Sequence, residues 1–174
     1  PRFQESGDLQ PLGHVLALAR SAGSNRIAVV VGPGMDAVAD EARHHIPSAE
    51  VFVQRQQLGT ADAVKAAAAA IANHDGHVIV LFADTPLFRP ETVQDVRSAL
   101  DGGASVAVVG FEAADPHGYG RLLRDEHGRL IAIREHKDAS PDERRTRLCN
   151  AGVMGFDAAH LRAVLDRITD NNAN

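Results

Sequence analysis

The sequence predicts an α/β fold in which a mixed, mostly parallel sheet is flanked by helices and carries a small antiparallel hairpin. Residues 78–82 (V-I-V-L-F) form an apolar run without polar alternation, which is typical of a strand buried on both faces. Similar runs alternate with segments of helical periodicity, and the connections are short. Residues 121–134, with a turn at 125–128, have the pattern of an antiparallel hairpin.

The remaining elements follow from the same two periodicities. Helical spacing predicts helices at residues 13–23, 35–45, 61–73, 90–102 and 158–168. Apolar runs predict strands at residues 26–31, 50–53, 78–82, 105–111, 121–124, 129–134 and 150–156. Thr60 is expected to be the N-cap of the third helix. Ala37 is expected to face the core from the second helix, and Leu122 and Leu130 from the hairpin.

Length and composition favour one domain over residues 1–174 and exclude several classes of protein. No apolar run approaches the length of a membrane span. The single cysteine, Cys149, cannot form an internal disulfide, which predicts a reducing, cytoplasmic location. A scattered net charge of −5 argues against a nucleic-acid partner, because binding to a phosphate backbone needs a basic surface.

Asp84 is the first candidate for chemistry. It follows the apolar run closely, and Pro86 prevents the strand from continuing, so the carboxylate is expected in a turn at the strand's carboxyl end. Open α/β sheets bind ligands at that edge. A carboxylate without neighbouring Cys or clustered His suits a hard cation such as Mg²⁺, held together with substrate phosphates. The alternative is a turn residue that only caps the next segment.

Two further polar regions lie at predicted strand ends. Residues 54–60 offer a planar amide and a Gly-Thr pair, which can meet the edge of a nucleobase or simply cap the next helix. Residues 118–120 (G-Y-G) are either a flexible turn or a place where backbone amides approach a ligand. Glu135 and Asn150 can bind sugar hydroxyls, although acidic side chains are usually just solvated.

The other reactive side chains point to no separate chemistry. His44, His45 and His136 lack the spacing of a zinc helix, so they are interpreted as exposed histidines. Cys149 has no His or Asn partner nearby in the sequence and is interpreted as a small buried residue. The absence of G-x-G-x-x-G, Walker and G-x-S-x-G motifs argues against a dinucleotide oxidoreductase, a P-loop enzyme and a serine hydrolase.

Five motifs occur together in a definite order. They are Q-x-x-Q-L-G-T-A-D-A from residue 54, L-F-A-D-T-P-L from residue 81, D-P-x-G-Y-G-R from residue 115, I-R-E-H-K-D-A from residue 133 and C-N-A-G from residue 149. Through this combination, residues 13–174 resemble the N-terminal uridylyltransferase half of the bacterial bifunctional enzymes that make UDP-N-acetylglucosamine. The combination is specific, whereas each motif alone is weak.

The resemblance implies a Rossmann-like nucleotide-diphospho-sugar transferase fold. It implies an enzyme that joins UTP and N-acetylglucosamine 1-phosphate to give UDP-N-acetylglucosamine and pyrophosphate for peptidoglycan synthesis. It further implies that Asp84 is catalytic and holds Mg²⁺. The substrate-binding residues that it implies are Gln54, Gly59 and Thr60 at uracil, Gly120, Glu135 and Asn150 at N-acetylglucosamine, and Phe82 and Ala83, where the family often has Tyr and Gly.

The likeness is incomplete at both ends. The family's glycine-rich L-A-A-G-x-G-T-R phosphate loop and its later E-Y-Y-L-T-D segment do not occur in the 174 residues. The resemblance therefore predicts a chain truncated at both ends and inactive alone. It also implies a downstream acetyltransferase domain through which family members form homotrimers. Two alternatives stay open: a transferase for another sugar or nucleotide, and a non-catalytic nucleotide-sugar-binding or regulatory domain.

Overall fold

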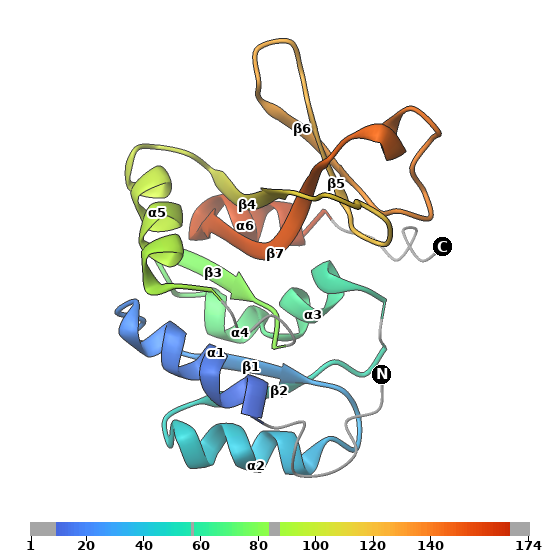
Figure 1. Ribbon diagram of the computed structural model, residues 1–174. Coiled ribbons are helices and arrows are strands. Elements are labelled where there is room, and N and C mark those ends of the chain that lie inside the picture. Colours follow the sequence, from blue (N-terminus) through green and yellow to red (C-terminus); the bar gives the residue numbers. More distant parts are fainter. Residues whose placement is uncertain (1–9, 57, 84–87, 168–174) are drawn as a thin grey trace. The chain divides into compact units, whose positions relative to one another are not determined.

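The computed structural model describes residues 10–56, 58–83 and 88–167 (Figure 1). The chain forms two compact units. The larger comprises Pro1–Ala107 and Gly155–Asn174, and the smaller comprises Val108–Met154. Two strands, β4 (Val106–Glu112) and β7 (Leu148–Asp157), run through both units.

The other elements of the larger unit alternate between helix and strand. In chain order they are α1 (Gln10–Ser21), β1 (Ala28–Val31), α2 (Asp36–His45), β2 (Glu50–Val53), α3 (Thr60–Ala66), α4 (Ala68–Ile71), β3 (His77–Leu81), α5 (Pro90–Asp101) and α6 (Ala158–Leu165). The smaller unit holds β5 (Arg121–Arg124), β6 (Leu130–Arg134) and the short 3-10 helix η1 (Glu143–Arg145). Among the described residues, no helix combines the length and the hydropathy that crossing a membrane requires.

The strands form two sheets. Strands β1 and β2 make a parallel pair, with Val29 opposite Val51. The second sheet has the order β3-β7-β5-β6, with β4 also paired to β7. Strand β5 runs antiparallel to both β6 and β7. The predicted mixture of parallel and antiparallel strands with helices is confirmed. The division of the strands between two sheets was not predicted, because apolar runs mark strands without specifying their partners.

Strand β3 is covered on both faces, as its continuous apolar run predicts (Figure 1). Ile79 and Leu81 pack in a cluster with Leu18 of α1 and Val93 of α5. Val78 belongs to a different cluster, whose buried members come from α4 and α6. Alternating side chains of a strand point to opposite faces, so each face has its own helical layer. Strand β3 therefore joins two apolar clusters of the larger unit, one on each of its faces.

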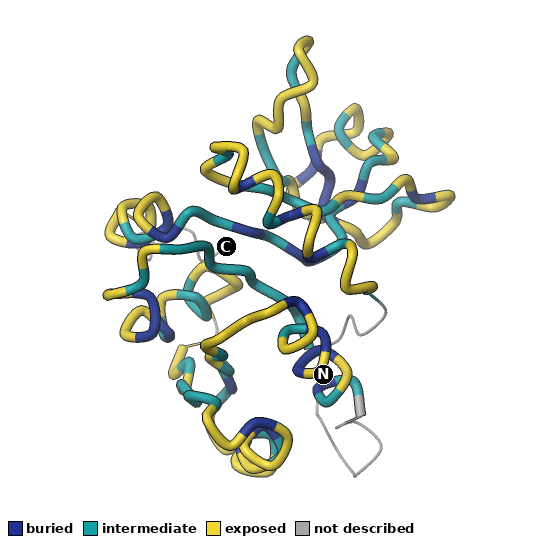
Figure 2. The backbone as a smooth tube through the Cα atoms, turned by 90° about the vertical axis from the view of Figure 1, so that its left-hand side faces the viewer, coloured by how far each residue is buried: buried dark blue, intermediate teal, exposed yellow. Residues whose placement is uncertain are grey.

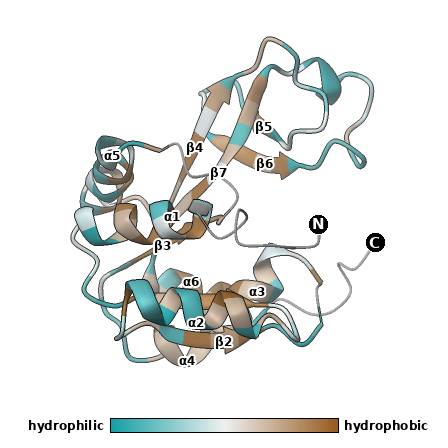
Figure 3. Cartoon of the chain, turned by 60° about the horizontal axis from the view of Figure 1, so that its bottom comes forward, coloured by the Kyte–Doolittle hydropathy of each residue, from teal (hydrophilic) through white to brown (hydrophobic). Residues whose placement is uncertain are grey.

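The β1–β2 pair is covered by α1 and α2 through a third apolar cluster. Its buried residues are Leu12, Leu16, Ala42 and Ile46, with Val29 of β1 packed against them. Figure 3 shows the apolar strand β2 beside α2, which also carries hydrophilic residues. The prediction that Ala37 faces inward is wrong, because Ala37 is exposed. Ala39 and Ala42 are buried instead, since residues three apart share one face of a helix.

The alanine-rich segment is helical but not continuous. The single helix predicted at residues 61–73 is interrupted at Ala67, which has φ −92° and ψ 16° and separates α3 from α4. A run of alanines favours a helix but does not determine which face of that helix packs against the core. Tertiary contacts therefore determine where the helix is interrupted. After the interruption, Ala70 and Ile71 are both buried, and Ile71 packs against Leu161.

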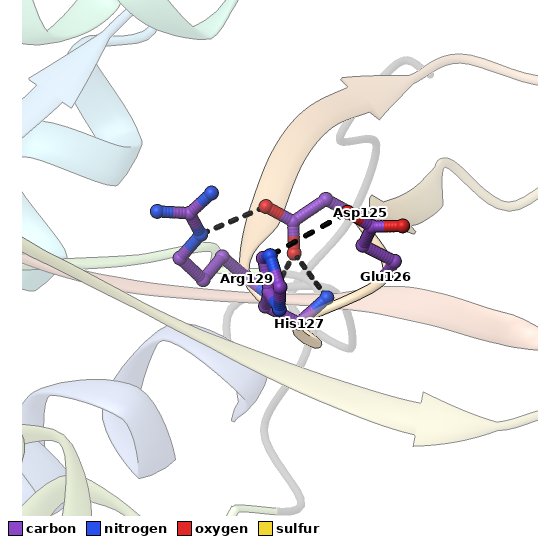
Figure 4. A network of polar contacts seen from close by, with 4 residues as sticks. All are labelled: Asp125, Glu126, His127 and Arg129. Atoms are coloured by element: carbon purple, nitrogen blue, oxygen red, sulfur yellow. Dashed lines mark hydrogen bonds and ion pairs between the residues drawn. The ribbon is translucent and has the colours of Figure 1, made fainter.

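The hairpin of the smaller unit is closed by a polar turn (Figure 4). Oδ1 of Asp125 accepts from the backbone N–H of His127 (3.0 Å) and of Arg129 (2.9 Å), and its Oδ2 accepts from Nε of Arg129 (2.7 Å). Backbone hydrogen bonding from Arg129 is the main reason that the pKa of the Asp125 carboxyl lies below its usual value. Figure 2 shows mostly exposed chain around this turn.

The facing residues of the hairpin are only partly as predicted. Leu122 is buried, as expected, but the prediction that Leu130 faces inward is wrong, because Leu130 is 41% exposed. The β5–β6 pairing shifts register between Leu123 and Arg124. Leu130 pairs with Arg124, which shares a face with Leu122 but is exposed, and the next residue, Ile131, is 65% exposed, so both faces of the hairpin are exposed at this end.

Candidate functional site

The side chain of Gln54 has a fixed orientation at the end of β2. Its backbone N–H donates to the carbonyl of Val31 at 2.8 Å. Its amide nitrogen donates to the carbonyl of Gly59 (3.1 Å) and to Oδ2 of Asp62 (2.8 Å). The carbonyl oxygen of Gly59 and Oδ2 of Asp62 are both hydrogen-bond acceptors. The part of the carboxamide that faces them must therefore be the NH₂ group, because only a donor can bond to both. Among the contacts of the described residues, the carboxamide oxygen is therefore the end of Gln54 that is left for a ligand.

Gly59 and Thr60 form the start of α3. Gly59 has φ +109°, in the region that residues with a Cβ rarely adopt, although a Cβ there would meet nothing within 4 Å. The requirement for glycine is thus one of backbone conformation. The prediction that Thr60 is the N-cap is wrong: Gly59 occupies that position, and Thr60 is the first residue of the helix.

The residues after β3 are described only in part. Phe82 and Ala83 are half-buried, and Ala83 packs against the cluster beneath α1 and α2. Asp84 lies outside the described residues, so the structure does not test its predicted metal-binding role. Within the described ranges, no three or more His, Cys, Asp or Glu side chains are grouped so that they could hold a metal ion. The magnesium site therefore stays a prediction from the sequence.

The three residues predicted to bind the sugar lie together in the smaller unit. The backbone N–H of Asn150 donates to the carbonyl of Gly120 at 2.8 Å. A Cβ added at Gly120 would lie 3.3 Å from Oε1 of Glu135, so the carboxylate packs against the glycine. Oδ1 of Asn150 accepts from the N–H of Gly152 at 3.0 Å, which fixes its amide group. The structure thus groups Gly120, Glu135 and Asn150, separated by up to 30 positions in sequence.

Sequence reasoning missed the two side chains beneath this group. Arg121 is only 1% exposed, and its guanidinium donates to the carbonyl of Tyr119 and to Nδ1 of His136 (3.2 Å). His136 is half-buried, so its interpretation as an exposed histidine is wrong, whereas His44 and His45 are exposed as predicted. Nothing in the sequence marks Arg121, which follows G-Y-G, as a buried residue. Arginine is rarely fully buried, so an exposed side chain is the expectation.

A capping arrangement organises the loop after His136. The N–H of Ser140 donates to Oε2 of Glu143 (2.8 Å), and the N–H of Glu143 donates to Oγ of Ser140 (3.2 Å). The backbone hydrogen bond from Ser140 is the largest reason that the pKa of Glu143 is lowered. The S-x-x-E spacing of a capping box is visible in the sequence and would have predicted this turn. Arg144 follows directly and donates from Nε to the carbonyl of His136 at 3.2 Å.

Cys149 is a core residue and not an exposed thiol. It is fully buried, as predicted, and burial is the main cause that raises the pKa of its thiol. A thiol must ionise to act as a nucleophile, and a raised pKa opposes this.

Helices that cover a mixed sheet define an α/β domain, and such domains bind ligands at the carboxyl ends of their strands. Residues 4–146 match the model of the MobA-like NTP transferase domain family, and the chain belongs to this family. The predicted nucleotidyltransferase class is therefore confirmed.

Proteins named bifunctional protein GlmU are similar to this chain. The protein of Xanthobacter autotrophicus is 56% identical over 93% of the chain, and that of Azorhizobium caulinodans is 54% identical over 93%. The chain spans only 36% of the length of each. The resemblance to the bifunctional enzymes that was predicted from the five motifs is confirmed.

Solved structures support the fold. UDP-glucose pyrophosphorylase complexed with UDP-glucose is 16% identical, with a TM-score of 0.71 over 93% of this chain and 70% of that chain. The apo form of a UDP-glucose pyrophosphorylase is 15% identical, with a TM-score of 0.72 over 94% and 71%. At this identity the likeness shows the fold alone, and it confirms the predicted fold class.

Proposed function

We propose that this chain forms the nucleotidyltransferase domain that joins UTP and N-acetylglucosamine 1-phosphate to give UDP-N-acetylglucosamine and pyrophosphate. The proposal is supported by the GlmU relatives and by their correspondence with the five sequence motifs. The observation that carries it is the grouping of Gly120, Glu135 and Asn150, the residues that the resemblance implies at N-acetylglucosamine.

The orientation of Gln54 supports uracil as the base. Uracil presents an N–H donor at N3, whereas cytosine presents an acceptor at that position. The amide nitrogen of Gln54 is held by Gly59 and Asp62, so its oxygen is available to accept from N3–H. Cytosine would place two acceptors opposite each other, which leaves both unsatisfied. Gly59 and Thr60 complete the proposed base-binding loop.

The sugar group supports an N-acetylated hexose phosphate. A carboxylate such as Glu135 accepts hydrogen bonds from sugar hydroxyls, and the NH₂ of Asn150 can donate to a hydroxyl or carbonyl oxygen. Gly120 has no side chain to fill the space beside the Glu135 carboxylate. Each residue thus contributes a different recognition element at one place.

The reaction requires no nucleophilic side chain. An oxygen of the sugar phosphate attacks the α-phosphorus of UTP, and the bond from that phosphorus to the β-phosphate oxygen breaks, so that pyrophosphate leaves with the electron pair. Both reactants are anions, so positioning and charge stabilisation supply most of the catalysis. The buried Cys149 agrees with this scheme.

The finer parts of the proposal rest on the resemblance. Asp84 is proposed to hold Mg²⁺, which when bound neutralises phosphate charge, and Phe82 and Ala83 are proposed to bind substrate. Synthesis of a peptidoglycan precursor in the cytoplasm, and assembly as a trimer through an acetyltransferase domain, belong to the same proposal. The 174 residues include no glycine-rich phosphate loop, so we expect them to have little activity alone.

A pyrophosphate-release assay on the protein at its natural length tests the function. We expect UTP with N-acetylglucosamine 1-phosphate to exceed CTP, GTP or glucose 1-phosphate by at least about tenfold in kcat/KM. Binding of both substrates without release of pyrophosphate would instead support the non-catalytic alternative. Preference for another nucleotide or sugar would contradict the assignment.

An Asp84→Asn variant tests the metal site. We expect turnover to fall by about 10²- to 10³-fold, because one group that stabilises charge in the transition state is lost. Calorimetry should show that binding of the sugar phosphate changes much less. Asp95→Asn serves as the control for removing a carboxylate elsewhere in the larger unit. Full activity of the Asp84 variant would exclude the proposed magnesium ligand.

A further inference from the structure

Arg121 is the one buried charged residue among those that the structure describes. It follows Gly120 directly and lies opposite Cys149 in the β5–β7 pairing. No carboxylate neutralises it within the described contacts; its partners are the carbonyls of Tyr119 and Arg144 and the ring of His136. A buried charge is costly unless other groups satisfy it, so this arrangement calls for an explanation beyond packing.

The hydrogen bond between Arg121 and His136 determines which nitrogen of the His136 ring carries the proton. Arginine has no acceptor, so Nδ1 of His136 must accept from Nη2 of Arg121 at 3.2 Å. The same Nδ1 accepts from the backbone N–H of Gly118, also at 3.2 Å. Nδ1 therefore carries no proton, and a neutral ring carries its proton on Nε2. A second proton would remove the acceptor and break both hydrogen bonds.

The ring joins the two segments that carry the sugar-binding group. Gly118 lies two residues before Gly120, and His136 directly follows Glu135. Arg121 adds a hydrogen bond to the carbonyl of Tyr119, the residue between the two glycines. The same two side chains thus set the separation between Gly120 and the Glu135 carboxylate, where a Cβ would lie at 3.3 Å.

We propose that Arg121 and His136 are positioning residues that hold Gly120 and Glu135 in the geometry that binds the sugar phosphate, and that protonation of His136 releases this geometry. The inference deepens the proposed function and rests on it. Neither side chain need touch the substrate, so neither is a catalytic residue. Together the two residues form the Arg121–His136 clamp.

The surroundings keep the ring neutral near pH 7. Burial is the main cause that lowers the pKa of His136 from its ordinary value of 6.5. The charged groups facing the ring act in the same direction with one exception: His117, Arg121 and Arg144 lower its pKa, and Asp115 raises it. The His117 ring lies 4.4 Å from it between centroids. The clamp is therefore intact at neutral pH and is lost as the pH falls below 6.5.

Two substitutions of His136 separate hydrogen bonding from ring packing. In His136→Asn the side-chain oxygen can take the place of Nδ1 as acceptor, but it does not titrate, whereas His136→Phe keeps an aromatic ring without the acceptor. At pH 8 we expect the Phe variant to raise the KM for N-acetylglucosamine 1-phosphate about tenfold, with the KM for UTP and kcat within about twofold. The Asn variant should keep the wild-type KM.

The pH profile supplies the readout that a purely structural role would not change. The substrate phosphate also titrates near pH 6, so the wild-type profile contains both groups. The Asn variant removes only the contribution of His136, and we expect its KM to rise less than that of the wild type between pH 7 and 5.5. His127→Asn is the matched control, because His127 is exposed in the same unit and should retain the wild-type profile.

Arg121→Lys tests the other half of the clamp. A lysine ammonium is a point donor and cannot span a carbonyl and the ring as the guanidinium fork does. We expect a five- to tenfold rise in the KM for the sugar phosphate, with the KM for UTP unchanged. Arg124→Lys, an exposed change on the same strand, should have no effect. Equal losses for both substrates, or an Asn variant that keeps the wild-type pH profile, would overturn the proposal.

A measurement without turnover distinguishes failure of the clamp from failure of the function. Imidazole ¹⁵N shifts report whether Nδ1 or Nε2 of His136 carries the proton. We expect the proton on Nε2 and a protonation midpoint below 6.5. A proton on Nδ1 overturns the clamp, even in an active enzyme. A wild-type protein that fails to use UTP and the sugar phosphate overturns the proposed function, and with it the substrate assigned to the clamp.

Discussion

Nε2 of Gln54 donates a 2.8 Å hydrogen bond to Oδ2 of Asp62, eight residues along the chain in the first turn of α3. This contact orients a side chain at the end of one strand from the helix that follows. It gives a structural reason for one orientation of the Gln54 carboxamide. The orientation, rather than the presence of glutamine alone, is what can distinguish one pyrimidine from another.

Removing Asp62 should weaken the discrimination between UTP and CTP. In Asp62→Ala the carboxamide loses one of its two acceptors and can rotate to present NH₂ to the base, which suits cytosine. We expect the ratio of kcat/KM for UTP over CTP to fall about fivefold, since one hydrogen bond is worth about 1 kcal/mol. Competition assays with the two nucleotides measure this ratio. Asp36→Ala, in the first turn of α2, is the control; an unchanged ratio in Asp62→Ala would contradict the role.

Gly155 of β7 should not tolerate a side chain. A Cβ at this position would overlap Cγ1 of Val96 and would lie 2.9 Å from Cδ1 of Leu100, both of α5. We expect Gly155→Ala to lower the free energy of unfolding by about 1–3 kcal/mol through overpacking. Denaturant unfolding measures the loss. In the double variant with Val96→Ala the added methyl gains room, so the two losses should not add; strict additivity would argue against this steric contact.

The hairpin turn should lose stability in acid through Asp125. Its pKa is lowered in the folded state, chiefly by the backbone hydrogen bond from Arg129, so the unfolded chain binds its proton more readily. The stabilisation is fully present above the unfolded value near 3.8 and is lost as the pH falls through the folded pKa. Unfolding of Asp125→Asn should therefore depend less steeply on pH between 5 and 2.5. Asp142→Asn corrects for the loss of one charge, and a slope equal to that of the wild type would contradict the prediction.

Local patterns predict the elements well but not the contacts that place polar groups. The apolar run at residues 78–82 predicts a strand covered on both faces, and the clusters around Ile79 and Val78 confirm it. The exposed Leu130 shows the limit, because it pairs with Arg124 on the face of Leu122, yet both faces of the hairpin are exposed at this end. Spacing does not report how far a hairpin extends beyond the core.

The sequence likewise predicts one part of the candidate site and not the other. The motifs predict that Gly120, Glu135 and Asn150 act together, and the structure places these residues close to one another. The burial of Arg121 and the bond to His136 depend on tertiary contacts across 15 positions, which no local pattern encodes. The S-x-x-E spacing at Ser140 was present in the sequence and would have located the turn that carries Arg144.

Leu161 and Val164 of α6 offer a matched test of the core behind β3. Leu161 is 4% exposed and packs with Ile71 and Leu165, whereas Val164 is 38% exposed on the same helix. We expect Leu161→Ala to cost about 2–5 kcal/mol of unfolding free energy, because it removes buried apolar atoms and leaves a cavity. Val164→Ala should change it by less than about 0.5 kcal/mol beyond helix propensity. Denaturant titration of both variants decides the matter: similar losses would mean that α6 does not cover β3 with the face that contains Leu161.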